Sequence, residues 1–271
     1  MSLTAWSLDP SLVYVALAAG LYVLGSSGRD RPQPLQALAF SASLLTIVIA
    51  LDSPIDHYAD QLFWVHMVQH ILLLTVAPPL LLLGRPWPRM WRALPLQPRT
   101  KVARAIALSR RMAPMRALAR PLPAWILFNA TIIAWHIPAA YDATLTSGVV
   151  HACEHAMFFF IGLLFWARVI DPGPLRPRLI WPIRIAYTAG TMVVGWLLAI
   201  TLVMVPHAIY SYYSALQTRP GGISAMTDQQ LAAGVMWVPG SLAYAITFII
   251  GFYRWLEPDR SVNPASAAYT T

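Results

Sequence analysis

The chain has 271 residues, of which 58% are hydrophobic and only 11% are charged. Soluble domains carry about 25% charged residues, so this sequence has too few polar side chains to cover a water-exposed globule. The net charge of +8 could suggest a nucleic-acid partner, but the arginines cluster beside apolar segments, where anionic lipid and membrane topology explain them better. The composition predicts an integral membrane protein and argues against nucleic acid as a partner.

Seven stretches are apolar enough to cross a bilayer, for which a helix needs about 20 residues. Helices are expected rather than strands, because the stretches run apolar instead of alternating and no water satisfies an open backbone in lipid. We therefore expect an all-α, polytopic membrane protein with a seven-transmembrane-helix bundle, forming a single membrane domain over residues 1–271. In chain order the spans are 8–25, 35–52, 61–84, 122–139, 149–169, 183–205 and 231–256.

The N-terminal segment and the cysteine content exclude two other features. Residues 1–10 contain no Lys or Arg, so the basic start of a cleaved signal peptide is absent and we expect the first span to be retained. Cys153 is the only cysteine, which excludes an intrachain disulfide and a metal site built on a cysteine pair.

The basic residues predict the orientation, because Lys and Arg favour the cytoplasmic side. Eighteen of the nineteen lie after the first, third, fifth and seventh spans, and ten of these fall in the loop 85–121. The opposite loops hold only Arg219. We expect the N-terminus outside and the C-terminus inside. Part of the basic loop, beginning at Lys101, alternates basic and apolar residues and is equally typical of a helix in the headgroup layer and of a solvated loop.

The histidines gather toward the outer ends of the predicted spans. Two pairs have i,i+4 spacing, His66 with His70 and His151 with His155, which places each pair on one face of a helix. Glu154 lies on the same face as the second pair, whereas Cys153 points away from it. Polar groups at this depth usually face a bundle interior, a cavity or a ligand. Two pairs at matching depth, level with His136, favour a metal site over a hydrogen-bonded polar cluster or a haem pocket.

The sequence predicts the identity of the metal less closely than the position of the site. Imidazoles suit zinc, copper and iron, and a carboxylate favours zinc or iron. Met67, Met204 and Met236 are thioethers that could hold copper(I), although methionine in an apolar helix more often packs the core. His57 and His207 are typical of interfacial histidines. Asp228 precedes the last span, where capping that helix is a better explanation than reaching the histidines. Pro78 and Pro79 predict a kink in the third span.

Five sequence motifs occur in an order that resembles the CtaG-type cytochrome c oxidase assembly factors, from about residue 35 to residue 256. They are His66-Met-Val-Gln-His70, Ala77-Pro-Pro-Leu-Leu-Leu-Leu-Gly84-Arg-Pro, Trp135-His136-Ile-Pro138 with Tyr141-Asp142, His151-Ala-Cys-Glu154-His155 with Phe158, and Asp228-Gln-Gln-Leu-Ala-Ala-Gly234-Val-Met236-Trp237. Each motif alone is weak, but the ordered set is specific.

The resemblance implies a heptahelical protein of the bacterial plasma membrane that supports formation of haem–copper oxidase. It also implies a part in supplying copper to that enzyme. It does not extend to the additional copper-resistance-like membrane domain that some members of this family carry. By motif position, the functional residues would be His66, His70, His136, His151, Glu154, His155 and Asp228.

Three functions follow as hypotheses. The first is an assembly factor that presents a metal, with copper as the leading candidate, to an oxidase subunit. Its metal site would lie near the outer face of the membrane, and a small number of exchangeable ligands would allow the metal to be released. The second is a zinc-dependent membrane hydrolase with Glu154 as the base. The third is a haem-binding membrane protein with axial histidines on facing helices. The expected partners are an oxidase subunit and membrane lipids, with a homo-oligomer as a further expectation.

Overall fold

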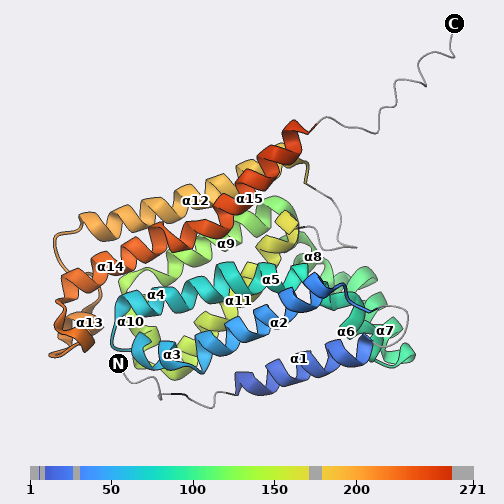
Figure 1. Ribbon diagram of the computed structural model, residues 1–271, viewed down its shortest axis with the longest axis horizontal. Helices are drawn as coiled ribbons and strands as arrows, with labels where there is room; N and C mark the ends of the chain where they lie inside the picture. The colour runs from blue at the N-terminus through green and yellow to red at the C-terminus, as the bar shows by residue number, and fades with distance from the viewer. Residues whose placement is uncertain (1–5, 7–9, 27–30, 171–178, 258–271) are drawn as a thin grey trace, which may run out of the picture.

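The protein is an elongated bundle of helices, described by a computed structural model over residues 6, 10–26, 31–170 and 179–257 (Figure 1). Within these ranges every regular element is a helix, so the all-α class predicted from the sequence is confirmed. The longer helices run side by side along the long axis, and the short ones close the two ends (Figure 1).

The first half of the chain forms helices that pack against one another in pairs. Helix α2 contacts both α1 and α5, and α3 packs against α4. Proline occupies the first turns of α2 and α3, where its missing N–H costs no helical hydrogen bond. The elements are α1 (Ser11–Gly25), α2 (Pro34–Leu51), α3 (Pro54–Ala59), α4 (Phe63–Ile71), a π-helical turn η1 (Leu72–Val76) and α5 (Ala77–Leu83).

The predicted disturbance at Pro78 and Pro79 takes the form of the π-helical turn η1, which joins α4 to α5 in one span. Pro78 cannot donate to the carbonyl of Leu74, four residues earlier. That carbonyl instead accepts from the indole N–H of Trp166 at 3.1 Å, across to α11. A side chain of a neighbouring helix thus satisfies the backbone group that the proline frees.

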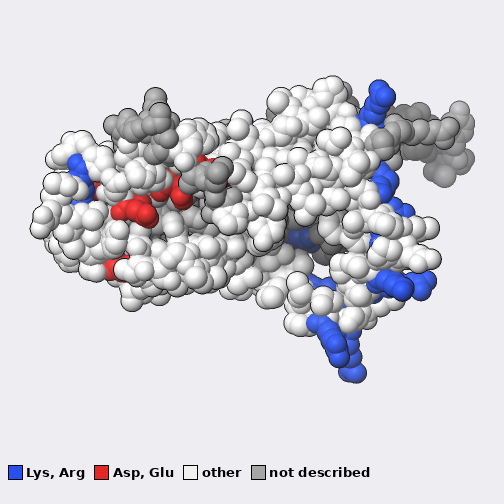
Figure 2. Space-filling model, turned by 90° about the horizontal axis from the view of Figure 1, so that it is seen from below, with Lys and Arg blue, Asp and Glu red and all other residues white. Residues whose placement is uncertain are grey.

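The basic segment forms short helices at one end of the bundle: α6 (Pro86–Ala93), α7 (Leu96–Leu108), a 3₁₀ turn η2 (Arg110–Met112) and α8 (Ala113–Leu118). The sequence from Lys101 onward is typical of either a helix or a solvated loop. It begins inside α7, so its first part is helical, and α7 has no buried residue. Figure 2 shows most of the visible Lys and Arg side chains gathered at this end of the molecule and the visible Asp and Glu side chains toward the other, where a basic side chain also lies. The charge is therefore segregated along the long axis.

The second half of the chain supplies the remaining helices. Among them α12 packs along both α14 and α15, and α11 packs against α5 and α9. The elements are α9 (Pro121–Trp135), α10 (Pro138–Thr146), α11 (Gly148–Ile170), α12 (Trp181–Met204), α13 (Ser211–Ala215), a 3₁₀ turn η3 (Pro220–Gly222), α14 (Ala225–Trp237) and α15 (Pro239–Leu256).

Five helical segments of the described chain are long and apolar enough to cross a membrane: Pro34–Leu51, Phe63–Leu83, Gly148–Ile170, Trp181–Met204 and Ala225–Leu256. A sixth is reached if Arg110–Leu118 and Pro121–Trp135, bent by 69° at their junction, form one span. Helix α1 is apolar but has only 15 residues. Large apolar side chains such as Leu38, Leu197 and Ile249 are exposed on the outer faces, as lipid contact requires. The length and composition of these helices are those of a multi-pass membrane protein. The count of seven spans stays a prediction.

Candidate metal centre

The two predicted histidine pairs lie on facing helices inside the bundle. On α4 the rings of His66 and His70 are 4.3 Å apart, and on α11 those of His151 and His155 are 4.1 Å apart. The His66 ring lies 5.0 Å from that of His151, which joins the two pairs across the helices. The i,i+4 spacing therefore aligns each pair on one face, and both faces meet.

Four of these side chains form a compact group, which we call the histidine–glutamate cluster: His66, His70, Glu154 and His155. One potential ligand atom from each lies within 4.8 Å of all the others. Glu154 Oε2 is 3.8 Å from His66 Nε2 and 3.5 Å from His70 Nε2. Around a tetrahedral ion with bonds of 2.0–2.2 Å, neighbouring ligand atoms are roughly 3.4 Å apart. Small side-chain movements would bring this set onto one ion.

The cluster is buried, yet six of its nitrogen and oxygen atoms have no hydrogen-bond partner among the described residues. His66 and Glu154 are 0% exposed, and His70 and His155 are buried as well. The unpartnered atoms are His66 Nε2, both ring nitrogens of His70, both carboxylate oxygens of Glu154 and His155 Nε2. Each such atom costs about 1–3 kcal/mol of desolvation. A shared cation would satisfy all four residues at once, so the donor set fits a metal ion.

Tyr213 fixes which nitrogen of His66 faces the cluster. Its hydroxyl donates to the carbonyl of Ala59 at 2.5 Å and lies 3.1 Å from His66 Nδ1. Burial raises the pKa of the Tyr213 hydroxyl well above its ordinary value, so the phenol keeps its proton for that bond. Its oxygen therefore accepts from Nδ1–H of His66, which leaves the Nε2 lone pair for a ligand. This is how a second layer of hydrogen bonds orients metal-binding histidines.

Asp142 holds in place the short helix that carries Tyr213. The carboxylate of Asp142, on α10, accepts from the backbone N–H groups of Ser211 at 3.1 Å and Tyr212 at 3.3 Å, and from the Ser211 hydroxyl. These bonds satisfy N–H groups at the start of α13, which is the role of a helix cap. Two segments about 70 residues apart in the chain thus cooperate to position one imidazole.

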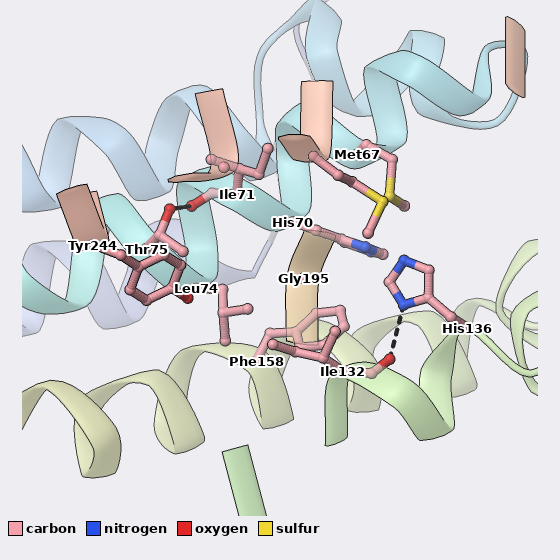
Figure 3. A pocket seen from close by; sticks show the side chains of 12 residues that line it. Met67, His70, Ile71, Leu74, Thr75, Ile132, His136, Phe158, Gly195 and Tyr244 are labelled. Atoms are coloured by element: carbon pink, nitrogen blue, oxygen red, sulfur yellow. Dashed lines mark hydrogen bonds between the residues drawn. The ribbon is translucent and has the colours of Figure 1, made fainter. Parts of the chain in front are cut away.

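The other two predicted histidines lie beside the cluster rather than in it. His151 has a buried, unpartnered Nε2 within the described structure, and its ring stacks obliquely on His155. His136 closes α9, and its Nδ1 bonds to the carbonyl of Ile132 at 2.8 Å. His136 and His70 both line a cavity of about 70 Å³ adjoining the cluster (Figure 3). The structure therefore gathers both of them close to the site.

Asp228 has a different place from the one expected. Its carboxylate accepts from the backbone N–H groups of Phe63 at 2.9 Å and Trp64 at 3.0 Å, at the start of α4. The cap of its own helix, α14, is Ser224, whose hydroxyl accepts from Thr227 N–H. The prediction that Asp228 caps its own helix was wrong, because it caps the neighbouring one. It is outside the histidine–glutamate cluster and caps the helix that carries His66.

The prediction that Cys153 points away from the site is confirmed, the interfacial place of His57 stays a prediction, and the sequence did not identify two tyrosines beside the site. Cys153 is exposed, on the side of α11 away from the cluster, and His57 is exposed beside Gln61. The sequence did not single out Tyr213 as part of the site, and it offered Tyr141 only within a family motif. The Tyr141 ring lies 5.1 Å from that of His66, and its buried hydroxyl has no partner in the described chain. Nothing local to residues 205–224 signals that Tyr213 reaches α4.

These observations define a class: a multi-pass helical membrane protein with a buried group of three imidazoles and one carboxylate that could hold a metal ion. The model of the cytochrome c oxidase caa3 assembly factor family (Caa3_CtaG) matches residues 13–258. The chain belongs to that family, and the resemblance inferred from the sequence is confirmed.

The chain is also similar to three mycobacterial proteins of longer sequence. Uncharacterized proteins of Mycobacterium bovis and Mycobacterium tuberculosis are each 26% identical to it over 273 residues, and one of Mycobacterium leprae is 25% identical over 272 residues. Each alignment covers 96% of this chain and 40% of the relative, so the chain spans about two fifths of their length. No solved structure matches the chain.

Proposed function

We propose that this protein supports assembly of a cytochrome c oxidase by binding copper at the histidine–glutamate cluster and handing it to an oxidase subunit. The family assignment supports the process, oxidase assembly. The single observation that carries the metal is the set of buried, unpartnered ligand atoms from His66, His70, Glu154 and His155. In this proposal the protein is not an enzyme, and the metal is its cargo.

Copper suits this donor set for two reasons. Imidazole, which three of the four residues supply, is a good ligand for copper. The cluster also has only four residues on two helices, α4 and α11, rather than a closed cage. A site that must release its metal requires exchangeable ligands of this kind.

The charge distribution supports a site near the outer face of the bacterial plasma membrane. The Lys and Arg side chains gather around α6 to α8, and α4 begins at the opposite, acidic end (Figures 1 and 2). His66 and His70 lie in α4, the nine-residue helix that begins the span Phe63–Leu83. Because basic residues favour the cytoplasm, the acidic end would face outward and the cluster would lie just beneath that surface. The same orientation follows from seven spans, counting α1 and α9 with the five long helical segments.

The test is metal analysis of purified protein. The wild type is expected to carry at least one copper per chain, and the His66→Ala/His155→Ala variant is expected to lose the copper that the cluster holds. His57→Ala is the matched control, because His57 is exposed and lies outside the cluster. Equal copper in the double variant and the wild type would overturn the proposal. A deletion strain should lose oxidase activity and regain part of it when copper is added.

A zinc-dependent membrane hydrolase is the second candidate, because three imidazoles beside one carboxylate are also a donor set for catalytic zinc. In that case His66, His70 and His155 would hold the ion, and Glu154 would act as base to its water. Stably bound zinc, with turnover of an amide or ester lipid and normal oxidase in a deletion strain, would favour it. A Soret absorption band in the purified protein would instead support the haem alternative.

A further inference from the structure

We infer that the cavity beside the histidine–glutamate cluster is a second metal site, selective for copper(I), formed by the thioethers of Met67 and Met236 and the imidazole of His136. The inference rests on the proposed function, since it names the form in which the metal reaches the cluster. The cavity measures about 70 Å³ and lies between α4, η1, α9, α11, α12, α14 and α15.

His136 presents one nitrogen lone pair to this cavity. Its Nδ1 bonds to the Ile132 carbonyl, and because a carbonyl only accepts, Nδ1 must carry the ring proton. Nε2 is then unprotonated, and it is buried without a partner among the described residues. Figure 3 shows the His136 ring turned toward the cavity, facing the sulfur of Met67 and the ring of His70. A buried imidazole nitrogen held in this state is prepared to bind a metal.

Two methionines bring soft donors to the same space. Met67 is 1% exposed and lines the cavity from α4, and Met236 lines it from α14. Thioethers are soft ligands that select copper(I) over the harder divalent ions. Met204, the third methionine considered from the sequence, is 69% exposed and does not line the cavity.

The rest of the cavity wall favours a singly charged ion with few ligands. Ile71, Leu74 and Phe158 are among its lining residues, so the wall offers little to a hydrated cation. Divalent ions such as Mg²⁺ keep several waters and need several oxygen ligands, whereas the side-chain oxygens among the lining residues are the two hydroxyls of Thr75 and Tyr244. Copper(I) binds through two or three soft donors and costs less to desolvate because it carries one charge.

His70 connects the two sites. Its ring lines the cavity, and its Nε2 lies 3.5 Å from Glu154 Oε2 in the cluster. A copper(I) ion at the cavity is therefore one side chain away from the cluster. The ion moves from thioether ligands to imidazole and carboxylate ligands without changing its oxidation state, so the transfer requires no redox partner.

The test is copper(I) affinity, measured on the purified full chain by competition with the chromogenic chelator bicinchoninate. Met67→Leu/Met236→Leu removes both sulfurs while keeping side-chain volume. Met157→Leu/Met204→Leu is the matched control, because both of these methionines are exposed. We expect at least a tenfold loss of copper(I) affinity in the cavity variant and none in the control. Zinc(II) binding at the cluster should be unchanged in both, and the copper–sulfur signal in X-ray absorption should disappear only from the cavity variant.

The outcomes separate this inference from the proposed function. Copper(I) bound equally well by the wild type and the cavity variant, or a copper(I)-loaded wild type without a copper–sulfur signal, would overturn the second site. If His66→Ala/His155→Ala still lost its metal in that case, the cluster proposal would stand. A wild type that binds neither copper nor zinc would overturn both.

Discussion

Two fully buried carboxylates, those of Asp228 and Glu154, show how differently the same group is used in this bundle. Each is 0% exposed. Asp228 accepts two backbone N–H groups at 2.9 and 3.0 Å, so its charge is balanced by the first turn of α4. Glu154 has no hydrogen-bond partner in the described chain, only imidazole nitrogens at 3.5 and 3.8 Å. A buried charge that lacks partners indicates a ligand that the fold is built to receive.

The comparison assigns Asp228 to structure and Glu154 to metal binding, so substitutions should separate the two. Affinity for metal should depend on Glu154 and survive changes at Asp228. Stability without metal should show the reverse dependence.

Glu154→Gln should weaken copper binding by about 100-fold, because it removes the anionic ligand while keeping the side-chain shape. The metal-free variant should unfold at no lower temperature than metal-free wild type, since an unpaired buried charge is removed. Chelator competition and thermal unfolding in detergent measure the two effects. A variant with unchanged affinity would remove Glu154 from the metal centre.

Tyr213→Phe should weaken copper binding by about 10-fold or more, because second-layer partners of a metal-binding histidine typically contribute 10–100-fold. The variant loses the acceptor that holds His66 Nδ1–H in place. Tyr212→Phe is the control, since Tyr212 is the neighbouring residue on the same short helix. Equal losses in the two variants would mean that α13 as a whole, rather than the Tyr213 hydroxyl, supports the site.

Asp228→Asn should lower the free energy of unfolding by about 0.5–2 kcal/mol, the usual cost of losing a helix cap. The folded fraction should keep its copper, because the cluster does not include Asp228. Thermal unfolding, followed by metal analysis of the folded protein, gives both numbers. Loss of copper at unchanged stability would reverse the roles assigned to the two carboxylates.

Trp166→Phe should have the smallest effect, lowering the free energy of unfolding by about 1 kcal/mol through loss of one hydrogen bond. The indole N–H satisfies the Leu74 carbonyl that Pro78 leaves free. Copper affinity should not change, because Trp166 lies outside both the cluster and the cavity. A large loss of affinity would instead show that η1 sets the position of His70.

The sequence was enough to predict the helical class and the alignment of the histidine pairs, because both depend on local periodicity. His66 with His70 and His151 with His155 share faces for the same reason that any i,i+4 pair does. The placement of Asp228 could not be predicted in this way. Its partners, Phe63 and Trp64, are about 165 residues away, and only tertiary packing brings them together.

The role of Tyr213 and the cavity lined by Met67 could not be predicted from the sequence, for a related reason. The hydroxyl of Tyr213 reaches His66 only because α13 is fixed against α10 by Asp142. The cavity takes its donors from α4, α9 and α14, so no single segment carries its pattern. A methionine in an apolar helix is usually a packing residue, and only its neighbours show when it is more than that.

The most direct measurement of the central claim is an anomalous-scattering map at the copper edge, from crystals of the copper-loaded protein. We expect a peak between α4 and α11, within bonding distance of His66 Nε2, His70 Nε2 and Glu154. Copper bound elsewhere in the chain, with these side chains left without an ion, would contradict it.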